Sequence, residues 1–455
     1  LPAVLQVLLS QQFRLRALIL LYRFMNLGPW AVDLAMAVGI YPYMTKLLAS
    51  TTTEIREILI LVWARLSAVD MALHPELMKR DGFDYFVAYL ANNIQMQNEP
   101  VSEKVKLCDT VSAASAFTLA MLCRDNFDAQ QSCFDERVLD YFLVYLQRPD
   151  NGTEERACLR TWILLCLAEL WKAHPNAKWM AITYKLCVIA SKKEELESQQ
   201  RQRRNQQNQQ ANTPSFEELL ASSAEDDSVD ARNAQDLLIQ MAFHRSPLVR
   251  ASAIYAIGTL VSDLAQLGDD PGVLTIVGLV ERQLYAVLLQ AAGDGSPMVR
   301  REVVSVIGGC VLTSYMEQTV DAVARVVGEE LRGEGGRRVA AGDSPVDVLL
   351  GQMYKVLLKL SVDAHPDVAL AAREASDVLM QCYAHSQAFF DAEAQLDKAL
   401  HRMEISRSAA GQPPIVGFLR NARIGDALLG QPPQQQQPRG QNLRTQQQAQ
   451  AQRRL

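Results

Sequence analysis

One helix pattern recurs along this chain and limits its possible folds more than any other feature. In the segment 294–311, Ser296 and Pro297 predict a helix start, because serine favours the N-cap, where its side-chain oxygen accepts a backbone N–H, and proline favours the first helical position. Arg300 follows near that start. The next apolar residues recur at i, i+4, i+7 and i+11, which forms one stripe on a helix: Val299, Val303, Val306 and Cys310.

Four other segments repeat this pattern. Ser246-Pro247 and His365-Pro366 open two of them, and two earlier copies keep the pattern without the proline. An apolar residue followed by arginine opens four of the five copies, at Arg56, Arg160, Arg250 and Arg300, whereas Ala369 stands in the last. The stripe position seven residues in is small or medium-sized, as closely stacked helices require: Val62, Cys166, Ala256, Val306 and Ala375. This repetition predicts an all-α fold, an α-solenoid of armadillo/HEAT-type helical repeats.

Changes in composition divide the predicted solenoid. Residues 191–231 are rich in glutamine and charge and poor in branched apolar residues, which predicts a disordered insertion. A glycine-rich stretch predicts a flexible linker, and the glutamine-rich end predicts a disordered tail. We therefore expect N-terminal armadillo/HEAT repeats at 1–190, the insertion at 191–231, middle HEAT repeats at 232–327, the linker at 328–345, a last helical pair at 346–405 and the tail at 406–455.

The totals restrict the class of protein. The 455 residues exceed what one compact core usually supports, and 49% apolar residues are enough for a continuous stacked core. The net charge of −6 argues against a general nucleic-acid binder, which would carry a basic excess. Neither a signal peptide nor an uncharged apolar run of about 18 residues is found, so we expect no membrane insertion. The chain begins at Leu1 in the middle of the pattern, which we interpret as a piece of a longer protein.

The sequence offers no residues for catalysis or for a bound cofactor. The eight cysteines are scattered without CxxC pairs, and Cys166 and Cys310 lie on predicted buried stripes, as in a reduced intracellular protein without a zinc site. Three histidines precede proline in predicted turns: His74, His174 and His365. Phosphate-binding, zinc-protease and serine-hydrolase motifs are missing. We therefore expect no enzymatic activity, no cofactor and no metal.

The first helices resemble a known family. The chain begins with LPAVLQVLLSQQFRLRALILLYRF and continues with LGPWAVDLAMAVGIYPYMTKLL, which is similar to the start of the helical-repeat region in the Raptor family, the regulatory scaffold subunits of the TOR kinase complex. Three later segments of this chain resemble later repeats of that family: SPLVRASAIYAIGTLV, DGSPMVRREVV and KVLLKLSVDAHPDVALAA. The resemblance covers roughly residues 1–185 and 232–385 in matching order.

The resemblance implies a longer protein, with a caspase-like domain lacking proteolytic activity before this region and a β-propeller after it. It implies a scaffold that binds the TOR kinase, recruits substrates carrying a short TOR-signalling motif, and docks on Rag-type GTPases. The implied location is the cytoplasm and, through partners, the lysosome or vacuole surface. The insertion at 191–231 and the short linker before Val346 depart from the family, which puts phosphorylation-dependent inhibition through that linker in doubt.

The resemblance also implies partner-binding residues. It places substrate capture on the first helices, where the candidates to meet an acidic motif are Arg14, Arg16, Arg23 and Lys46. It places GTPase docking on middle repeats near Arg160 and Trp162. Thr213 and Ser344 each precede proline in a predicted flexible segment and are candidate phosphorylation sites or plain linker residues. The basic candidates also fit solvated helix faces, and Arg160 also fits a structural ladder between repeats.

Other α-solenoid adaptors remain alternatives. A nuclear-transport carrier should show a ladder of Trp-x-x-x-Asn, whereas the residues four after each tryptophan are Leu34, Ser67, Cys166, Pro175 and Thr183. A phosphatase scaffold of uniform HEAT repeats should show more regular spacing than this chain. A HEAT-repeat enzyme acting on nucleic acid would need a basic face, which the acidic total disfavours.

Overall fold

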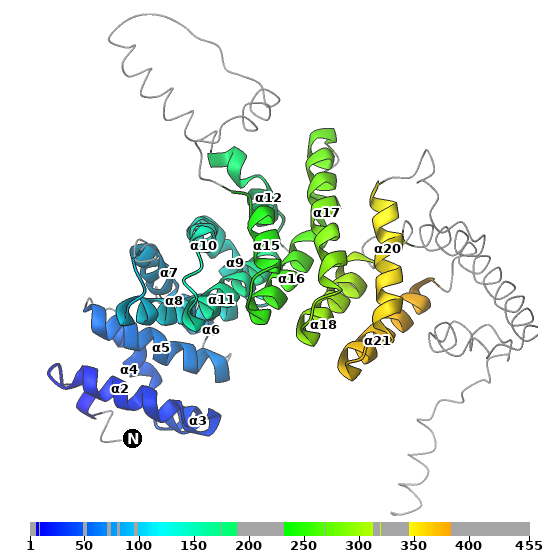
Figure 1. Ribbon diagram of the computed structural model, residues 1–455. Coiled ribbons are helices and arrows are strands. Elements are labelled where there is room, and N and C mark those ends of the chain that lie inside the picture. Colours follow the sequence, from blue (N-terminus) through cyan, green and yellow to red (C-terminus); the bar gives the residue numbers. More distant parts are fainter. Residues whose placement is uncertain are drawn as a thin grey trace, which may run out of the picture. The chain divides into compact units, whose positions relative to one another are not determined.

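The computed structural model describes residues 6–8, 10–48, 52–70, 74–79, 82–94, 99–172, 174–188, 232–268, 270–312, 319 and 345–383. Every regular element within these ranges is a helix, and the chain is an α-solenoid of armadillo/HEAT-type repeats, as predicted (Figure 1). The predicted insertion, the tail and nearly all of the linker lie outside the described residues.

The chain divides into two compact units. The larger is Leu1–Tyr315 with Gly342–Ala375, and it holds the repeats. Of the smaller, Met316–Ala341 with Ser376–Leu455, the structure describes only Thr319 and the end of the last helix.

Helices of 6 to 21 residues form the first part of the larger unit. They are α2 (Arg14–Met25), α3 (Pro29–Ala37), α4 (Tyr41–Leu47), α5 (Thr53–Val69), α6 (His74–Lys79), α7 (Gly82–Asn93), α8 (Glu103–Cys123), α9 (Phe127–Asp135), α10 (Val138–Gln147), α11 (Glu154–Trp171) and α12 (Pro175–Ile182). Side chains that accept a backbone N–H of the first turn set several of these starts. Ser102 caps α8, Asn126 caps α9 and Thr153 caps α11.

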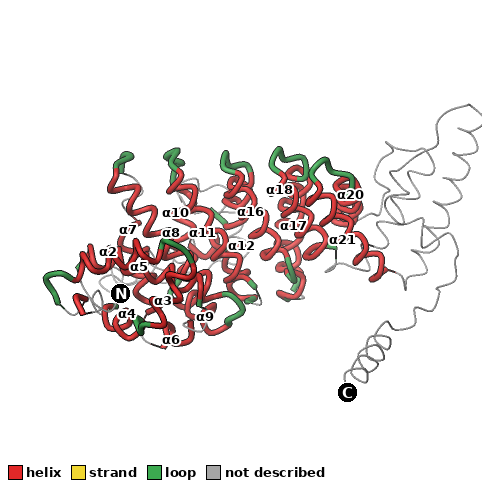
Figure 2. The backbone as a smooth tube through the Cα atoms, turned by 90° about the horizontal axis from the view of Figure 1, so that it is seen from below, coloured by secondary structure: helices red, strands yellow, loops and turns green. Residues whose placement is uncertain are grey.

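Fewer elements are described in the later repeats. They are α15 (Ala234–Ala242), α16 (Pro247–Val261), the 3-10 turn η3 (Leu264–Leu267), α17 (Pro271–Ala291), α18 (Pro297–Val306), the wide turn η4 (Ile307–Val311), α20 (Pro345–Leu360) and α21 (Pro366–Tyr383). Proline stands first in five of these helices, where its missing N–H has no partner to lose. Figure 2 shows the loops before α11, α16, α18 and α21 in a row along one edge.

The core lies where the second helix of one repeat stacks on that of the next. α8 packs on α5 and α11, α11 packs on α16, and α16 packs on α18. A Cβ atom added to Gly258 would lie 2.6 Å from a methyl group of Val306, and one on Gly308 would lie 2.8 Å from Cβ of Ala375. In these two copies, the predicted small stripe position therefore lies at a stacking contact, where Val306 and Ala375 each face a glycine of the preceding repeat.

Some helices were not anticipated from the sequence. Neither α9 nor α17 was predicted. Two His-Pro pairs that were expected only in turns stand at helix starts, since His74 opens α6 and Pro175 is the first residue of α12. Pro366 is the first residue of α21, as the repeat pattern predicted. A histidine ring nitrogen serves as a cap in α12, where His174 Nδ1 accepts the N–H of Ala177.

Among the described helices, α8 and α17 are long and apolar enough to cross a membrane by length and composition. α8 is mostly buried between neighbouring helices, whereas α17 is less so. Core helices of repeat proteins pass the same test, so this feature does not by itself indicate a membrane span.

Candidate functional site

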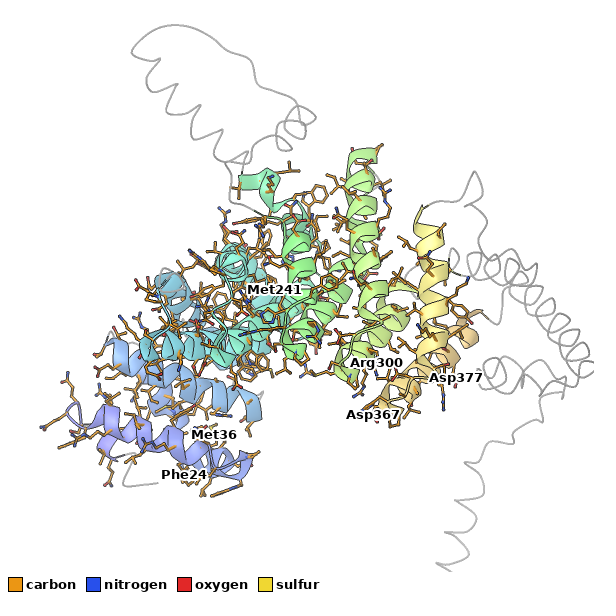
Figure 3. All side chains as sticks on the ribbon, viewed as in Figure 1. Phe24, Met36, Met241, Arg300, Asp367 and Asp377 are labelled. Carbon is orange, nitrogen blue, oxygen red and sulfur yellow. The ribbon has the colours of Figure 1, made fainter. Side chains whose placement is uncertain are left out.

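Arginines at the start of one repeat bind aspartates in the turn before the next. Arg250 on α16 donates from Nε to Asp294 Oδ2 (2.7 Å) and from Nη2 to Oδ1 (2.8 Å). Arg300, labelled on α18 in Figure 3, makes the same two bonds with Asp363, both 2.8 Å. A planar guanidinium fits a carboxylate in this two-pronged geometry, so each pair fixes the angle as well as the distance between two repeats. We call these contacts the ladder.

The ladder aspartates also start the next helix. Asp294 Oδ1 accepts the backbone N–H of Ser296 at 2.7 Å, and Asp363 Oδ1 accepts that of His365 at 2.8 Å. The predicted side-chain caps at Ser246 and Ser296 are wrong, since neither hydroxyl caps its helix. The residue two positions earlier, His244 or Asp294, instead accepts the N–H of the serine itself in a short side-chain turn that leads into the helix.

The ladder carboxylates are ionised at neutral pH. Burial opposes ionisation of Asp294, but hydrogen bonds from Arg250 and from the Ser296 N–H outweigh it and lower its pKa. The hydrogen bonds from Arg300 lower the pKa of Asp363. The four side chains of the two pairs are between 10% and 17% exposed, so water screens these charges only partly.

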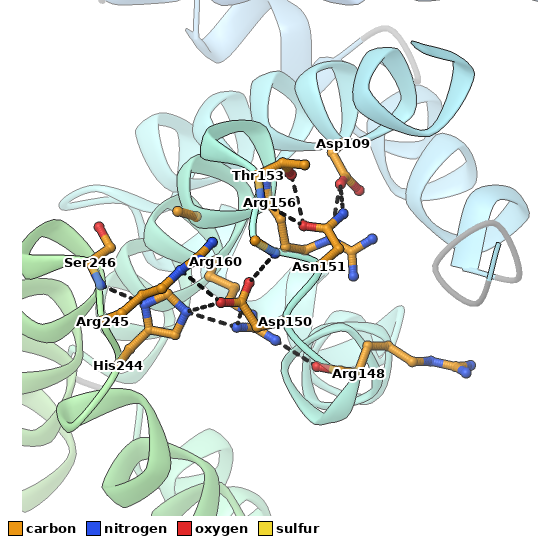
Figure 4. Close-up of polar contacts among 12 residues, drawn as sticks. Asp109, Arg148, Asp150, Asn151, Thr153, Arg156, Arg160, His244, Arg245 and Ser246 are labelled. Atoms are coloured by element: carbon orange, nitrogen blue, oxygen red, sulfur yellow. Dashed lines mark hydrogen bonds and ion pairs between the residues drawn. The ribbon is translucent and has the colours of Figure 1, made fainter. Parts of the chain in front are cut away.

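The contact between α11 and the turn before α16 forms the preceding rung of the ladder. There His244 stands three residues before the proline, at the position that Asp294 and Asp363 hold in the two later rungs. Its Nδ1 accepts the backbone N–H of Ser246 at 3.1 Å, and its Nε2 lies 3.3 Å from Asp150 Oδ2 and 3.0 Å from Arg160 Nη1 (Figure 4). Because Nδ1 is an acceptor, the neutral ring carries its proton on Nε2. The Nε2–H group donates to Asp150, and it cannot also accept a hydrogen bond from Arg160, because both groups are donors. The carboxylate of Asp150 therefore lies between the imidazole and the guanidinium and interacts with both.

Arg160 is enclosed by this rung. Its side chain is 3% exposed, its Nη1 lies 3.5 Å from Asp150 Oδ1, and its Nη2 donates to the carbonyl of Arg148 at 2.6 Å. Arg245 binds Asp150 from the exposed side at 3.0 Å. The guanidinium of Arg160 is thus buried among groups of its own chain, which fits the alternative of a structural ladder, and partner docking near it stays a prediction.

A fully buried ion pair lies one turn before Arg160. Arg156 Nε donates to Asp109 Oδ2 at 2.9 Å, and the two side chains are 1% and 0% exposed. Asn151 Nδ2 donates to the same carboxylate oxygen at 3.4 Å. The pair joins α11 to α8 of the preceding repeat. Sequence reasoning singled out Arg160 and missed Arg156, because the partner lies 47 positions away.

The basic candidates of the first helices fall on different faces. Arg16 and Arg23 are exposed and seven residues apart, which places them on the same side of α2. Arg14 and Arg23 are nine residues apart, about half a turn out of phase, so they lie on opposite sides of the helix. Arg14 is half-buried and its Nε donates to the carbonyl of Leu8 at 3.1 Å. Lys46 is exposed in the last turn of α4.

Exposed apolar side chains share the face of Arg16 and Arg23. Leu20 is 57% exposed, and the flanking residues Phe13 and Leu27 are 45% and 62% exposed. These three also follow one another at intervals of seven residues, so apolar and basic side chains alternate along one side. We call Phe13, Arg16, Leu20, Arg23 and Leu27 the α2 stripe. Clustered exposed apolar side chains of this kind mark protein interaction surfaces more often than chance.

The remaining candidates differ in their surroundings. Trp162 is half-buried on α11, with its ring edge-on to Phe117 of α8 at 4.6 Å between centroids. Thr213 and Ser344 lie outside the described residues. Within the described part of the chain, no group of three or more histidine, cysteine or acidic side chains is arranged to hold a metal ion.

Comparison with known proteins identifies relatives. The chain is 30% identical over 411 residues to the Target of rapamycin complex 1 subunit mip1 of Schizosaccharomyces pombe, covering 90% of this chain and 26% of that protein. It is 39% identical over 193 residues to the Protein raptor homolog of Dictyostelium discoideum, covering 42% of this chain and 12% of that protein. The chain therefore spans about a quarter of the first relative's length, or less for the second. No protein-family model matches it.

A solved structure is similar in both sequence and fold. The crystal structure of Chaetomium thermophilum Raptor aligns with a TM-score of 0.62 at 31% identity, covering 88% of this chain and 30% of that one. The alignment therefore reaches from the first repeats into the last ones.

Proposed function

This chain belongs to the Raptor family, and we propose that it acts as a non-catalytic scaffold subunit of TOR complex 1. The observation that carries the proposal is the match to a TOR complex 1 subunit over 90% of this chain. A helical stack with rigid ladder contacts suits this task, because it presents long surfaces held at fixed spacing. Its proposed location is the cytoplasm and, through partners, the lysosome or vacuole surface.

We place substrate recruitment on the α2 stripe. A short motif that combines acidic and apolar residues is the complement of a face on which Arg16 and Arg23 alternate with Leu20 and Leu27. Lys46 on α4 adds a further exposed positive charge among the first helices. Arg14 contributes less, since its guanidinium is engaged with the carbonyl of Leu8.

We place docking of Rag-type GTPases on the middle repeats around Trp162. A half-buried tryptophan whose ring is fixed by Phe117 has the features of an interface anchor, because it offers apolar area with little rotamer entropy to lose. Arg160 would support this surface from beneath, by holding the turn through Asp150.

The scaffold proposal is tested by recovering TOR kinase with the full-length protein. We expect the kinase to co-purify with the wild-type protein and with an R16E/R23E double variant alike. Binding of a fluorescent substrate-motif peptide should fall at least about tenfold in R16E/R23E, since each reversal replaces an attraction by a repulsion. R301E, at an exposed arginine of α18, is the matched control.

The two parts of the proposal fail separately. Absence of TOR kinase from the wild-type preparation would contradict the scaffold role itself. Peptide binding unchanged by R16E/R23E, with the kinase still recovered, would contradict only the assignment to the α2 stripe. For the GTPase surface, W162A should weaken GTPase recovery, whereas W30A, at a 57% exposed tryptophan of α3, should not.

A further inference from the structure

Three buried thiols meet where α8, α9 and α11 come together. Cys123 is the last residue of α8, Cys133 lies on α9 and Cys166 on α11. Their exposed fractions are 0%, 0% and 1%. The Sγ atoms of Cys123 and Cys133 are 3.3 Å apart.

The separation of the first two sulfurs is close to bonding range. A disulfide requires about 2.05 Å between sulfurs, so a shift of roughly 1.3 Å shared by two side chains would close the gap. The surrounding structure holds the two helices at this spacing. Gln130 of α9 donates from Nε2 to the carbonyls of Cys123 (3.1 Å) and Glu169 (3.0 Å).

The short helix α9 gives a route for reagents to the buried sulfurs. Asp125 before it and Arg137 after it both have left-handed backbone, with φ of 52° and 53°, which non-glycine residues rarely adopt. Among the described non-glycine residues only Asp263 shares this feature. Strained residues at both ends lower the cost of opening the segment between them, and such local opening exposes groups that are buried in the closed state.

We propose that Cys123 and Cys133 are a redox-sensitive pair that forms a reversible intramolecular disulfide when the protein meets a hydroperoxide. The thiolate of one cysteine attacks the outer oxygen of the peroxide, the S–O bond forms and the O–O bond breaks, which gives a sulfenic acid. The leaving alkoxide or hydroxide takes up the proton that the thiol lost and departs as an alcohol or water. The second thiolate then attacks the sulfenic sulfur, the S–S bond forms, and hydroxide leaves with the remaining proton as water. Two thiols are oxidised and one peroxide bond is reduced.

Cys123 is the thiol that reacts first. Hydrogen bonds from the thiols of Cys133 and Cys166 outweigh burial and lower its pKa, and the thiolate is the form that attacks peroxide. Cys133 resolves the sulfenic acid because its Sγ lies 3.3 Å from that of Cys123 in the closed structure. The product ties α9 to the end of α8, so oxidation would suppress the opening that admitted the oxidant. Disulfides of this kind in a reduced compartment are transient and serve as sensors.

Peptide mapping of the full-length protein tests this pairing. After hydrogen peroxide, blocking of free thiols with N-ethylmaleimide in denaturant and digestion with trypsin, Arg124 separates the two cysteines into peptides 107–124 and 125–137. We expect these peptides to appear joined, with the loss of two hydrogens, and to separate on reduction with dithiothreitol. Fragment ions should place the link at Cys123, leaving Cys108 of the same peptide blocked by the reagent.

Variants and a neighbouring thiol make the result decisive. C133S and C133A should each abolish the joined peptide, whereas C158S, at an exposed cysteine of α11, should leave it unchanged. A link from Cys123 to Cys166 would overturn the proposed pairing. In the wild-type protein, oxidation of the exposed Cys158 shows that the peroxide has reacted. If Cys123 and Cys133 were then both fully blocked by N-ethylmaleimide, the proposal would be overturned altogether. This test uses no variant and so does not depend on a variant folding.

Discussion

Arg300 and Asp363 lie 63 positions apart in the sequence and are joined by two parallel hydrogen bonds of 2.8 Å. The arginine belongs to the start of one repeat, and the aspartate to the turn that opens the next. The same carboxylate accepts the N–H of His365 and so also determines where α21 begins. One residue therefore sets both the start of a helix and its position relative to the helix before it.

The first prediction concerns the two hydrogen bonds that the guanidinium of Arg300 donates to Asp363. R300K keeps the charge but cannot make the two-pronged contact, so we expect it to lower the free energy of unfolding by about 2 kcal/mol, the scale of a hydrogen bond to a charged group. The pair is 15% and 10% exposed, which limits screening by water. Urea titration would measure the loss. R301K, at the exposed neighbour, is the control, and equal stability of the two variants would contradict a role for the ladder.

The sequence predicted the arginines of the ladder but not what they bind. The partner of Arg250 is 44 positions away and that of Arg300 is 63, so no local pattern joins them. The available signal was an aspartate or histidine three residues before the proline, which looks like ordinary turn composition in a single copy. Arg56, the first arginine of the series, differs from the later ones in the kind of group it contacts. Its guanidinium lies over the ring of Tyr85, 5.5 Å from the ring centroid, whereas Arg250 and Arg300 bind aspartates.

The second prediction concerns the close stacking of α16 on α18. G258A adds a Cβ atom 2.6 Å from a methyl group of Val306, so one of the two helices must shift. Overpacking of this kind costs about 1–3 kcal/mol of stability, which thermal unfolding would detect. G278A on α17 is the control, because nothing lies within 4 Å of the added atom and alanine favours a helix, so it should stabilise.

A double variant tests the cause of that loss. V306A removes the methyl groups that the new Cβ would meet, so G258A/V306A should be less destabilised than the sum of the two single variants. If the loss of stability in the double variant equalled the sum of the losses in the two single variants, the contact with Val306 would not be the cause. The effect of G258A would then come from another source, such as the backbone conformation at Gly258.

The candidate surface shows the same limit of sequence reasoning as the ladder. The basic residues of the first helices were identified by charge type alone, and the structure separates Arg14 from Arg16 and Arg23 because helical phase decides which face each one occupies. The exposed partners in the α2 stripe could not be found from hydropathy, because exposed and buried leucines of one helix look alike until the neighbouring helices are placed.

The third prediction concerns the buried pair Asp109 and Arg156. D109N leaves a guanidinium that is 1% exposed without its counter-charge, and removing one partner of a buried pair costs about 3–5 kcal/mol. We expect D109N to fail to fold or to unfold at a much lower urea concentration. A D109L/R156L double variant should recover most of the loss, because it leaves no buried charge behind. A double variant no more stable than D109N would show that the pair contributes shape instead of charge balance.

The fourth prediction concerns protonation of His244. Burial lowers the pKa of His244, and the positive charges of Arg160 and Arg245 lower it further. The negative charge of Asp150 raises it, but by less than the other effects lower it. Protonation would place a hydrogen on Nδ1, which now accepts the Ser246 N–H, and so would release the start of α16. The folded state therefore binds fewer protons than the unfolded state below the ordinary histidine value of about 6.5. The free energy of unfolding should fall as the pH drops through that value toward the lower folded-state pKa.

H244N isolates this contribution. Asparagine places Oδ1 where the ring has Nδ1, so it can still accept the Ser246 N–H, and it does not titrate near neutral pH. It lacks the contact of Nε2 with Asp150, which lowers stability at every pH, so the change between two pH values is the quantity to compare. Burial also lowers the pKa of His74 and His174, so the wild-type protein should lose stability for three reasons between about pH 7.5 and about pH 5.5, and H244N for two. Urea midpoints at both pH values would measure the difference. Equal losses of stability in wild type and H244N on acidification would contradict this prediction, because protonation of His244 would then cost nothing in the folded state although its Nδ1 accepts the Ser246 N–H.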